Sequence, residues 1–401
     1  MESPICSASP PLLQWHRGTQ VQLPLGRSWR YFSAFRCFVQ QDHHAARSAR
    51  TCILFKDTVS ETFVGMVASK DAVHFDSPVH VVINTSWSIG HMTHNLAIAG
   101  PHFLDGEQSF FLVGGQYNRM KHPLPKWRRA EQTTKQRNTG VWLARWPVDD
   151  VGAILAPPPP FDAAASSHAS FIATARRLFD GMHPGCVEGR NGTWLHRSGG
   201  RAACEFDGRL SLVRHRRRWL LFARANPTKR GHRYVQVTES QDLRKWSPFR
   251  LIEISQYGNS SNGDIYFFLV YKNPIQSNSL IAIFPLIQRG GAPGAACTGI
   301  AASLDGIHWS RIEPLVRCPY LDPKHQRDLC HPAGLVVNKK GSTEDDILIY
   351  LHNSVPYPDV YHESGPDGHL LLTQPMPSLM VHHLSRTALY TWTKRALGGL
   401  L

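Results

Sequence analysis

The sequence has no run of 18 or more apolar residues, and its N-terminal stretch lacks a basic region followed by an apolar one. We therefore expect a soluble protein with neither a membrane span nor a secretory signal, whose compartment the sequence leaves open. The eight cysteines include no C-x-x-C pair, which argues against a zinc ribbon and against a thioredoxin-like redox site. Their even number permits disulfides, and Cys186 with Cys204 is one candidate pair.

Familiar cofactor and nucleophile motifs are absent as well. There is no H-E-x-x-H or G-x-S-x-G motif, and the glycine-rich stretch 290–294 lacks the Lys-Ser/Thr ending of a phosphate-binding loop. The adjacent histidine pairs 43–44 and 382–383 would point to opposite sides of a strand. The sequence therefore predicts no metal site and no cofactor.

Acidic residues are scarce relative to basic ones. The chain has 30 Asp and Glu against 44 Lys and Arg, which gives a formal net charge of +14 at pH 7. Such an excess favours polyanionic partners. The basic run 214–218 resembles a nucleic-acid patch, but it lies between two apolar segments and is more economically a solvated hairpin. The charge therefore favours a polyanionic partner such as an anionic glycan, and nucleic acid is not expected.

A turn motif, S-x-D-x-x-x-aromatic, is repeated at residues 69–75, 240–246 and 303–309. Each copy follows an alternating apolar run and precedes a short strand-like run, which is typical of a turn between two strands. The Ser and Asp side chains can cap backbone N–H groups there, and the aromatic ring can pack between neighbouring sheets. The motif therefore predicts repeated antiparallel units.

Two further units, near residues 94–146 and 330–383, have the strand pattern without the motif. Five units of about four strands each predict an all-β fold, a five-bladed β-propeller with four-stranded antiparallel blades. We place it at residues 30–390, between an N-terminal extension 1–29 and a C-terminal tail 391–401, with an inter-blade insertion near 154–200. The segment 164–178 is the one place where we expect a helix.

The motif resembles the turns of five-bladed propeller glycoside hydrolases of the invertase, levanase, arabinanase and β-xylosidase type. In that group S-x-D-[LG]-x-x-W recurs between outer strands, as it does here at 240–246 and 303–309. The resemblance implies a carbohydrate substrate and carboxylates that converge on the propeller axis from the starts of the inner strands. The matching positions are Asn95, residues 205–209, Asp264 and residues 328–331.

Glu205, Asp207 and Asp264 are thus the candidate catalytic residues. Glu205, Asp207 and Arg209 share one face of an extended chain. One carboxylic acid would protonate the leaving oxygen, another would act as nucleophile or base, and Arg209 could keep Asp207 ionised. Two structural alternatives stay open: an ion pair with arginine for the first two residues, and a turn cap for Asp264.

The candidate substrate-binding residues are His94, Asn95, Trp127, Arg209 and His331. The family has an early Asp on its first catalytic blade, where this chain has His94 and Asn95; His94 or His331 could supply the acid instead, or could simply be a packed or surface histidine. Trp127 lies in a basic segment suited to stacking on sugars.

Two functions follow: a glycoside hydrolase or transglycosylase, and a non-catalytic propeller that binds an acidic glycan or another polyanion. The oligomeric state is left open.

Overall fold

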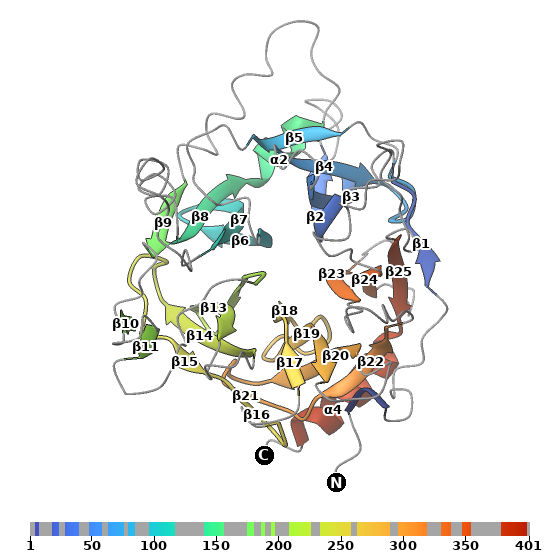
Figure 1. The fold of residues 1–401 in the computed structure, drawn as a ribbon. Helices are drawn as coiled ribbons and strands as arrows, with labels where there is room; N and C mark the ends of the chain where they lie inside the picture. The colour runs from blue at the N-terminus through green and yellow to red at the C-terminus, as the bar shows by residue number, and fades with distance from the viewer. Residues whose placement is uncertain are drawn as a thin grey trace, which may run out of the picture.

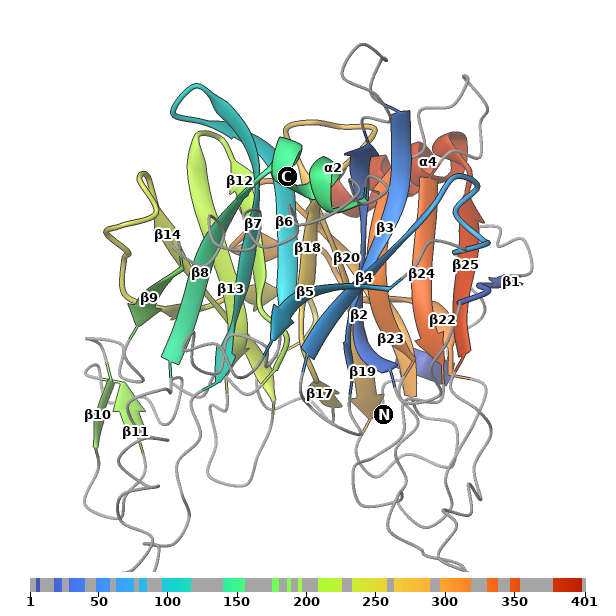
Figure 2. The same ribbon diagram turned by 90° about the horizontal axis from the view of Figure 1, so that it is seen from above.

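The structure is a computed structural model, and it describes residues 5–7, 18–23, 29–39, 48–57, 63–75, 79–84, 96–116, 140–155, 175–179, 186–188, 194–196, 208–225, 233–257, 263–288, 296–318, 330–337, 347–353 and 378–398. Strands dominate these ranges, and their sheets surround a common axis in a propeller arrangement (Figure 1). Seen from the side, the sheets stand next to one another with their strands running roughly along that axis (Figure 2). The prediction of an all-β propeller with antiparallel blades is confirmed.

Four sheets of the ring have four strands each. The first contains β2 (Trp29–Val39), β3 (Ser48–Asp57), β4 (Phe63–Ser69) and β5 (His80–Asn84). The second contains β6 (Ala97–Leu104), β7 (Glu107–Gln116), β8 (Gly140–Pro147) and β9 (Arg176–Phe179). The third contains β12 (Ser211–His215), β13 (Arg218–Ala225), β14 (Tyr234–Ser240) and β15 (Arg250–Leu251). The fourth joins β23 (His331–Val337), β24 (Ile347–Asn353) and β25 (Ser378–Leu384) to β1 (Thr19–Gln20).

A seven-stranded sheet occupies the rest of the ring. It contains β16 (Glu253–Ile254), β17 (Gly263–Ile265), β18 (Leu269–Lys272), β19 (Leu280–Gln288), β20 (Ala296–Ser303), β21 (His308–Trp309) and β22 (Glu313–Arg317). Strands β18, β19, β20 and β22 pair antiparallel in that order, whereas β16 and β21 pair in parallel. A separate two-stranded ribbon is formed by β10 (Cys186–Glu188) and β11 (Trp194–His196).

The sequence places Asp264 at the start of an inner strand, which would continue through residues 265–269, but this strand is divided in the structure. Ile265 of β17 lies opposite Leu286 of β19, and Leu269 of β18 lies opposite Ile283. Four residue steps on one side therefore span three on the other, so the chain bulges between the two short strands. The prediction of one continuous inner strand was wrong, and β18 is the part that reaches the axis.

The expected helix over 164–178 is wrong at its C-terminal end, because Arg176–Phe179 forms β9 and pairs with β8 as the outer strand of the second sheet. Pairing at an open sheet edge overrides the local helix preference there. Residues 164–174 of that segment lie outside the described ranges. The same strand shows that part of the expected insertion 154–200 belongs to a blade.

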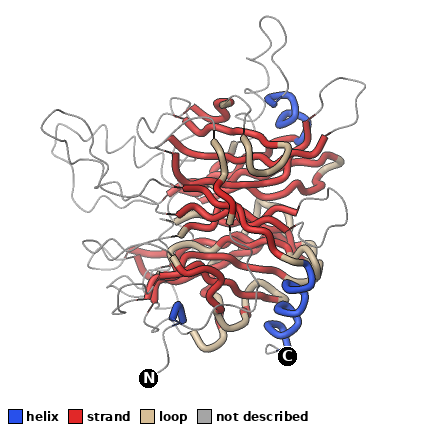
Figure 3. Tube along the Cα trace, turned by 90° about the vertical axis from the view of Figure 1, so that its right-hand side faces the viewer, coloured by secondary structure: helices blue, strands red, loops and turns tan. Residues whose placement is uncertain are grey.

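Two helices that the sequence did not indicate, α2 (Val148–Leu155) and α4 (Arg386–Gly398), follow β8 and β25. Figures 2 and 3 show both at the same end of the propeller. Trp392 and Thr393 of α4 are buried, and Asn273 Nδ2 donates to Thr393 Oγ1 at 3.1 Å. The helix therefore crosses the expected boundary at 390. Within the described ranges, no helix is long and apolar enough to cross a bilayer.

The three predicted turns share one hydrogen-bond pattern. The Asp Oδ1 atoms of Asp71, Asp242 and Asp305 each accept the backbone N–H groups two and three residues further on, at 2.8 to 2.9 Å. Each Ser Oγ accepts the N–H of the Asp that follows it at 3.2 to 3.3 Å. The Trp309 ring is fully buried and packs 6.0 Å from Phe222 of the neighbouring sheet. The predicted capping and anchoring roles are confirmed.

Three disulfides connect described segments. Cys6 of the 3-10 helix η1 (Ile5–Ser7) is bonded to Cys297 of β20. Cys37 with Cys52 joins β2 to β3, and Cys318 with Cys330 brackets the connection from β22 to β23. Of the suggested pair Cys186 and Cys204, Cys186 begins β10 and Cys204 lies outside the described residues.

Candidate functional site

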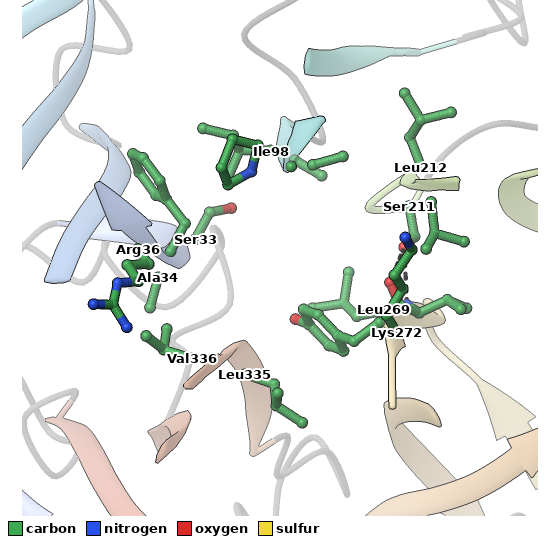
Figure 4. A pocket seen from close by; sticks show the side chains of 18 of the residues that line it. Ser33, Ala34, Arg36, Ile98, Ser211, Leu212, Leu269, Lys272, Leu335 and Val336 are labelled. Carbon is green, nitrogen blue, oxygen red and sulfur yellow. Dashed lines mark hydrogen bonds between the residues drawn. The ribbon is translucent and has the colours of Figure 1, made fainter. Parts of the chain in front are cut away.

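The innermost strands β2, β6, β12, β18 and β23 converge on one cavity of about 550 Å³ at the propeller axis (Figure 4). Its lining residues lie within 33–38, 97–102, 209–213, 269–274 and 333–337. Most of them are apolar, which is usual for a ligand site with a few placed polar groups. Every sheet of the ring thus contributes to a single axial site.

The inner strands run in the same direction, so the cavity has two distinct ends. Arg209, just before β12, donates to Ser33 Oγ in the first half of β2 and to the carbonyl of Pro332 at the start of β23. Arg36 donates to the carbonyl of Val337, the last residue of β23, at 2.9 Å. We call the end marked by Arg209 and Pro332 the starting end, and the end marked by Arg36 and Val337 the finishing end.

Two predicted substrate-binding residues, Arg209 and His331, meet at the starting end. Their side chains pack on the same ring: the Arg209 guanidinium carbon lies 5.5 Å from the centroid of Phe267, and the His331 ring lies 5.1 Å from it. Arg209 is only 3% exposed and His331 5%. Arg209 therefore lines the cavity from a buried position, whereas His331 packs behind it and does not line the cavity.

Tyr266 is a residue of this cluster that the sequence interpretation missed. Its ring stacks on His331 at 5.5 Å and lies 4.9 Å from the guanidinium carbon of Arg233 and 6.0 Å from that of Arg224. It is half-buried, whereas Phe267 is 1% exposed. Tyr266 is therefore the more exposed aromatic ring of this cluster, although it does not line the axial cavity. In the sequence, the aromatic run 266–268 just after Asp264 was the feature that could have indicated Tyr266. Only the bulge shows which of these rings is accessible.

Gly208 allows the chain to enter this cluster. A Cβ at Gly208 would lie 3.1 Å from the carbonyl oxygen of Tyr266 and 3.3 Å from Arg224 Cβ, closer than most real Cβ contacts. A side chain at this position would push against both neighbours. The residue that follows Asp207 in the sequence is therefore packed directly beside Tyr266.

Asp264 is buried in β17, and its Oδ1 accepts the backbone N–H of Arg233 at 2.9 Å. It does not line the axial cavity. This bond fixes a segment 31 residues earlier in the chain, not the turn in which Asp264 itself lies. The carboxylate thus fixes the start of β14 against β17 and holds Arg233 near Tyr266.

The other predicted site residues, Glu205, Asp207, His94, Asn95 and Trp127, lie outside the described residues. Two of them directly precede the site in sequence, since Asp207 is followed by Gly208 and Asn95 by the buried Leu96. Among the described residues that line the cavity there is no carboxylate.

The finishing end has a different character. His102 of β6 is partly buried, and burial, followed by the positive charges of Lys272 and Arg214, lowers its pKa to about 4. It is therefore neutral near pH 7. Burial also raises the pKa of Tyr271 to about 12, so its phenol keeps its proton. The sequence interpretation did not identify any of these residues.

No protein-family model matches the chain, and no curated protein matches its sequence. Solved structures similar to it over nearly its whole length include an N-acetylgalactosamine deacetylase from F. plautii, in complex with blood group B trisaccharide, at 11% identity and a TM-score of 0.49, covering 96% of this chain and 98% of that chain. Others are a GH62 α-L-arabinofuranosidase catalytic domain from Coprinopsis cinerea (10% identity, TM-score 0.46, 94% and 98% covered) and a family 117 glycoside hydrolase from Zobellia galactanivorans (9%, 0.44, 93% and 91%). The structural neighbours thus include glycoside hydrolases. At these identities and TM-scores, the similarities assign no substrate and no site residue to this chain.

Proposed function

We propose that this chain is a glycoside hydrolase or transglycosylase that acts on an oligo- or polysaccharide at the starting end of its axial cavity. We count the seven-stranded sheet as the fifth blade, because β18, β19, β20 and β22 pair in the order of a four-stranded blade. The observation that carries the proposal is the fixed position of Arg209, which hydrogen-bonds to two other sheets at the axis. Glu205 and Asp207 come four and two residues before it.

Glu205 and Asp207 are the proposed catalytic pair. In an extended chain both lie on the face of Arg209, whose positive charge would favour the ionised form of the nearer carboxylate, Asp207. Glu205 would then be the acid that protonates the glycosidic oxygen as the bond to the anomeric carbon breaks. Asp207 would attack that carbon or take a proton from the incoming water.

The remaining predicted residues take supporting roles in this proposal. Tyr266 offers a ring on which a sugar can stack, flanked by the Arg224 and Arg233 side chains. His94, Asn95 and Trp127 stay proposed substrate contacts. Asp264 is a positioning residue rather than a member of the pair, because its carboxylate holds the backbone of Arg233.

The test is turnover of a panel of glycosides and polysaccharides by Glu205→Gln and Asp207→Asn. We expect each variant to lose at least about a hundredfold in kcat and to retain substrate binding. Glu253→Gln is the matched control, because Glu253 lies on the outer strand β16 with its side chain 75% exposed. Full activity in both variants would remove these carboxylates from the mechanism.

A non-catalytic role in binding an acidic glycan is the second candidate. It is favoured by the absence of carboxylates among the described lining residues and by the arginines that flank Tyr266. In that case the wild-type protein would bind acidic oligosaccharides without cleaving them. Glu205→Gln and Asp207→Asn would then bind them at least as tightly as the wild type, since each removes a negative charge.

A further inference from the structure

Two cationic side chains from different blades, Arg36 and Lys272, bring positive charge to the finishing end of the axial cavity, and the neutral His102 lies at the same end. Arg36 of β2, His102 of β6 and Lys272 of β18 all line the cavity. Figure 4 shows Arg36 and Lys272 coming from opposite sides of the open space. Arg214 of β12 adds a third positive group, close enough to lower the pKa of His102.

No described carboxylate balances this charge. The acidic residues nearest in sequence to His102, Asp105 and Glu107, contact Arg145 at 3.5 and 3.0 Å instead. Arg36 donates one N–H to the carbonyl of Val337, and its guanidinium lies 5.7 Å from the Phe38 ring. A guanidinium has five N–H donors, so this bond leaves donors for another acceptor.

The surroundings strengthen any interaction with an anion at this end. The lining between the cations is apolar, with Ile98, Leu212 and Val336 among its members. An apolar wall lowers the local dielectric constant and makes a charge-assisted hydrogen bond stronger than it is in water. Phe103, which is 65% exposed and whose carbonyl accepts a hydrogen bond from Arg214, adds an aromatic surface at the end of β6.

We infer that the finishing end is a second ligand site, which binds the oxyanion of a sulfate or phosphate ester carried on a sugar-sized molecule, with Arg36 and Lys272 as its main contacts. The planar guanidinium of Arg36 can donate hydrogen bonds to two oxygens of such a group, and the ammonium of Lys272 supplies a point charge from the other side of the cavity. A cavity of about 550 Å³ has room for a ring attached to the ester. This site does not depend on the proposed chemistry at the starting end.

Affinity measurements by calorimetry test the assignment directly. The probes are inorganic sulfate, inorganic phosphate, a sulfated hexose, a phosphorylated hexose and an unmodified hexose. We expect Lys272→Gln and Arg36→Gln each to weaken binding of the anionic probes by at least about tenfold. Lys245→Gln removes the same charge from an exposed turn and should leave the affinity unchanged. The preferred ester shows which of the two oxyanions the site takes.

The His102 imidazole supplies an independent readout by NMR. An anion bound between Arg36 and Lys272 should raise the pKa of His102 from about 4 by at least about one unit, because it offsets the cations that disfavour imidazolium. An unchanged His102 titration at saturating sulfate and phosphate would overturn the proposal. So would an equal loss of affinity in Lys245→Gln, which would mean unspecific attraction to a basic protein. Lys272 is exposed, so its variant should fold even if Arg36→Gln does not.

Discussion

His308 and Asp305 meet on the exposed turn of the seven-stranded sheet, with Nδ1 and Oδ2 2.7 Å apart. The hydrogen bond that His308 Nδ1 donates to Asp305 raises the pKa of His308, and the pKa of Asp305 is lowered because its hydrogen bonds outweigh its partial burial. For His308, the contribution to stability is fully present below about pH 6.5 and is lost as the pH rises through the folded-state pKa. For Asp305, it is present above about pH 3.9 and is lost on acidification.

We therefore expect the free energy of unfolding to fall by less than about 1 kcal/mol through this pair between about pH 6 and pH 8, since both side chains are solvent-screened. Urea unfolding of the wild type and His308→Gln at both pH values measures the difference. In His308→Gln, the free energy of unfolding should fall less between the two pH values than it does in the wild type. An identical pH dependence in the two proteins would show that the pair contributes nothing to stability. Lys245 occupies the equivalent position in the third sheet, so that turn should not respond to pH in this range.

At the level of single residues, the sequence located part of the site and missed another part. Arg209 could be placed near the axis because the family resemblance points to the starts of the inner strands, and it lies just before β12. Tyr266 could not, since its accessibility depends on a bulge that no alternation predicts. Arg36, His102 and Lys272 look like ordinary surface positions until neighbouring blades are set side by side.

At the level of elements, the strands were predictable where an apolar alternation ends in the Ser-Asp turn. The turn is a local structure, because its hydrogen bonds all lie within a few residues. β9 and α4 were not predictable, because each is stabilised by an edge or surface formed by distant residues. Helix α4 packs against residues of β20 and β24, and no pattern within its own 13 residues predicts that contact.

Helix α4 gives a sharp test of this dependence on packing. Trp392 is 2% exposed within the apolar cluster that includes Ile349 and Leu351, whereas Tyr390 on the same helix is 45% exposed. We expect Trp392→Ala to reduce the free energy of unfolding by about 3–5 kcal/mol and Tyr390→Ala by less than about 1 kcal/mol. Denaturant unfolding measures both. Similar effects of the two substitutions would mean that α4 does not stabilise the propeller.

At the level of the whole molecule, a ring of sheets must be held closed where the chain's two ends meet. Strand β1 does this by pairing with β25, so that Thr19 lies opposite Val381 in the last sheet. The disulfide between Cys6 and Cys297 fastens the preceding segment to β20, 291 residues away. Covalent closure of so long a loop restricts the unfolded chain strongly.

Three disulfides together lead us to expect that the protein folds in an oxidising compartment.

The closing prediction concerns this long disulfide. Cys6→Ser should lower the free energy of unfolding by about 2–4 kcal/mol, and Cys297→Ser by about the same amount, because each breaks the same bond. The double variant should lose little more than either single one, since the two sulfurs act as one unit. Cys37→Ser opens a loop of only 15 residues in sequence separation and should cost less on the entropic argument alone. Chemical unfolding of the oxidised proteins measures all four. Additive losses in the double variant would show that Cys6 and Cys297 stabilise the protein separately and that the ring is closed by β1 alone.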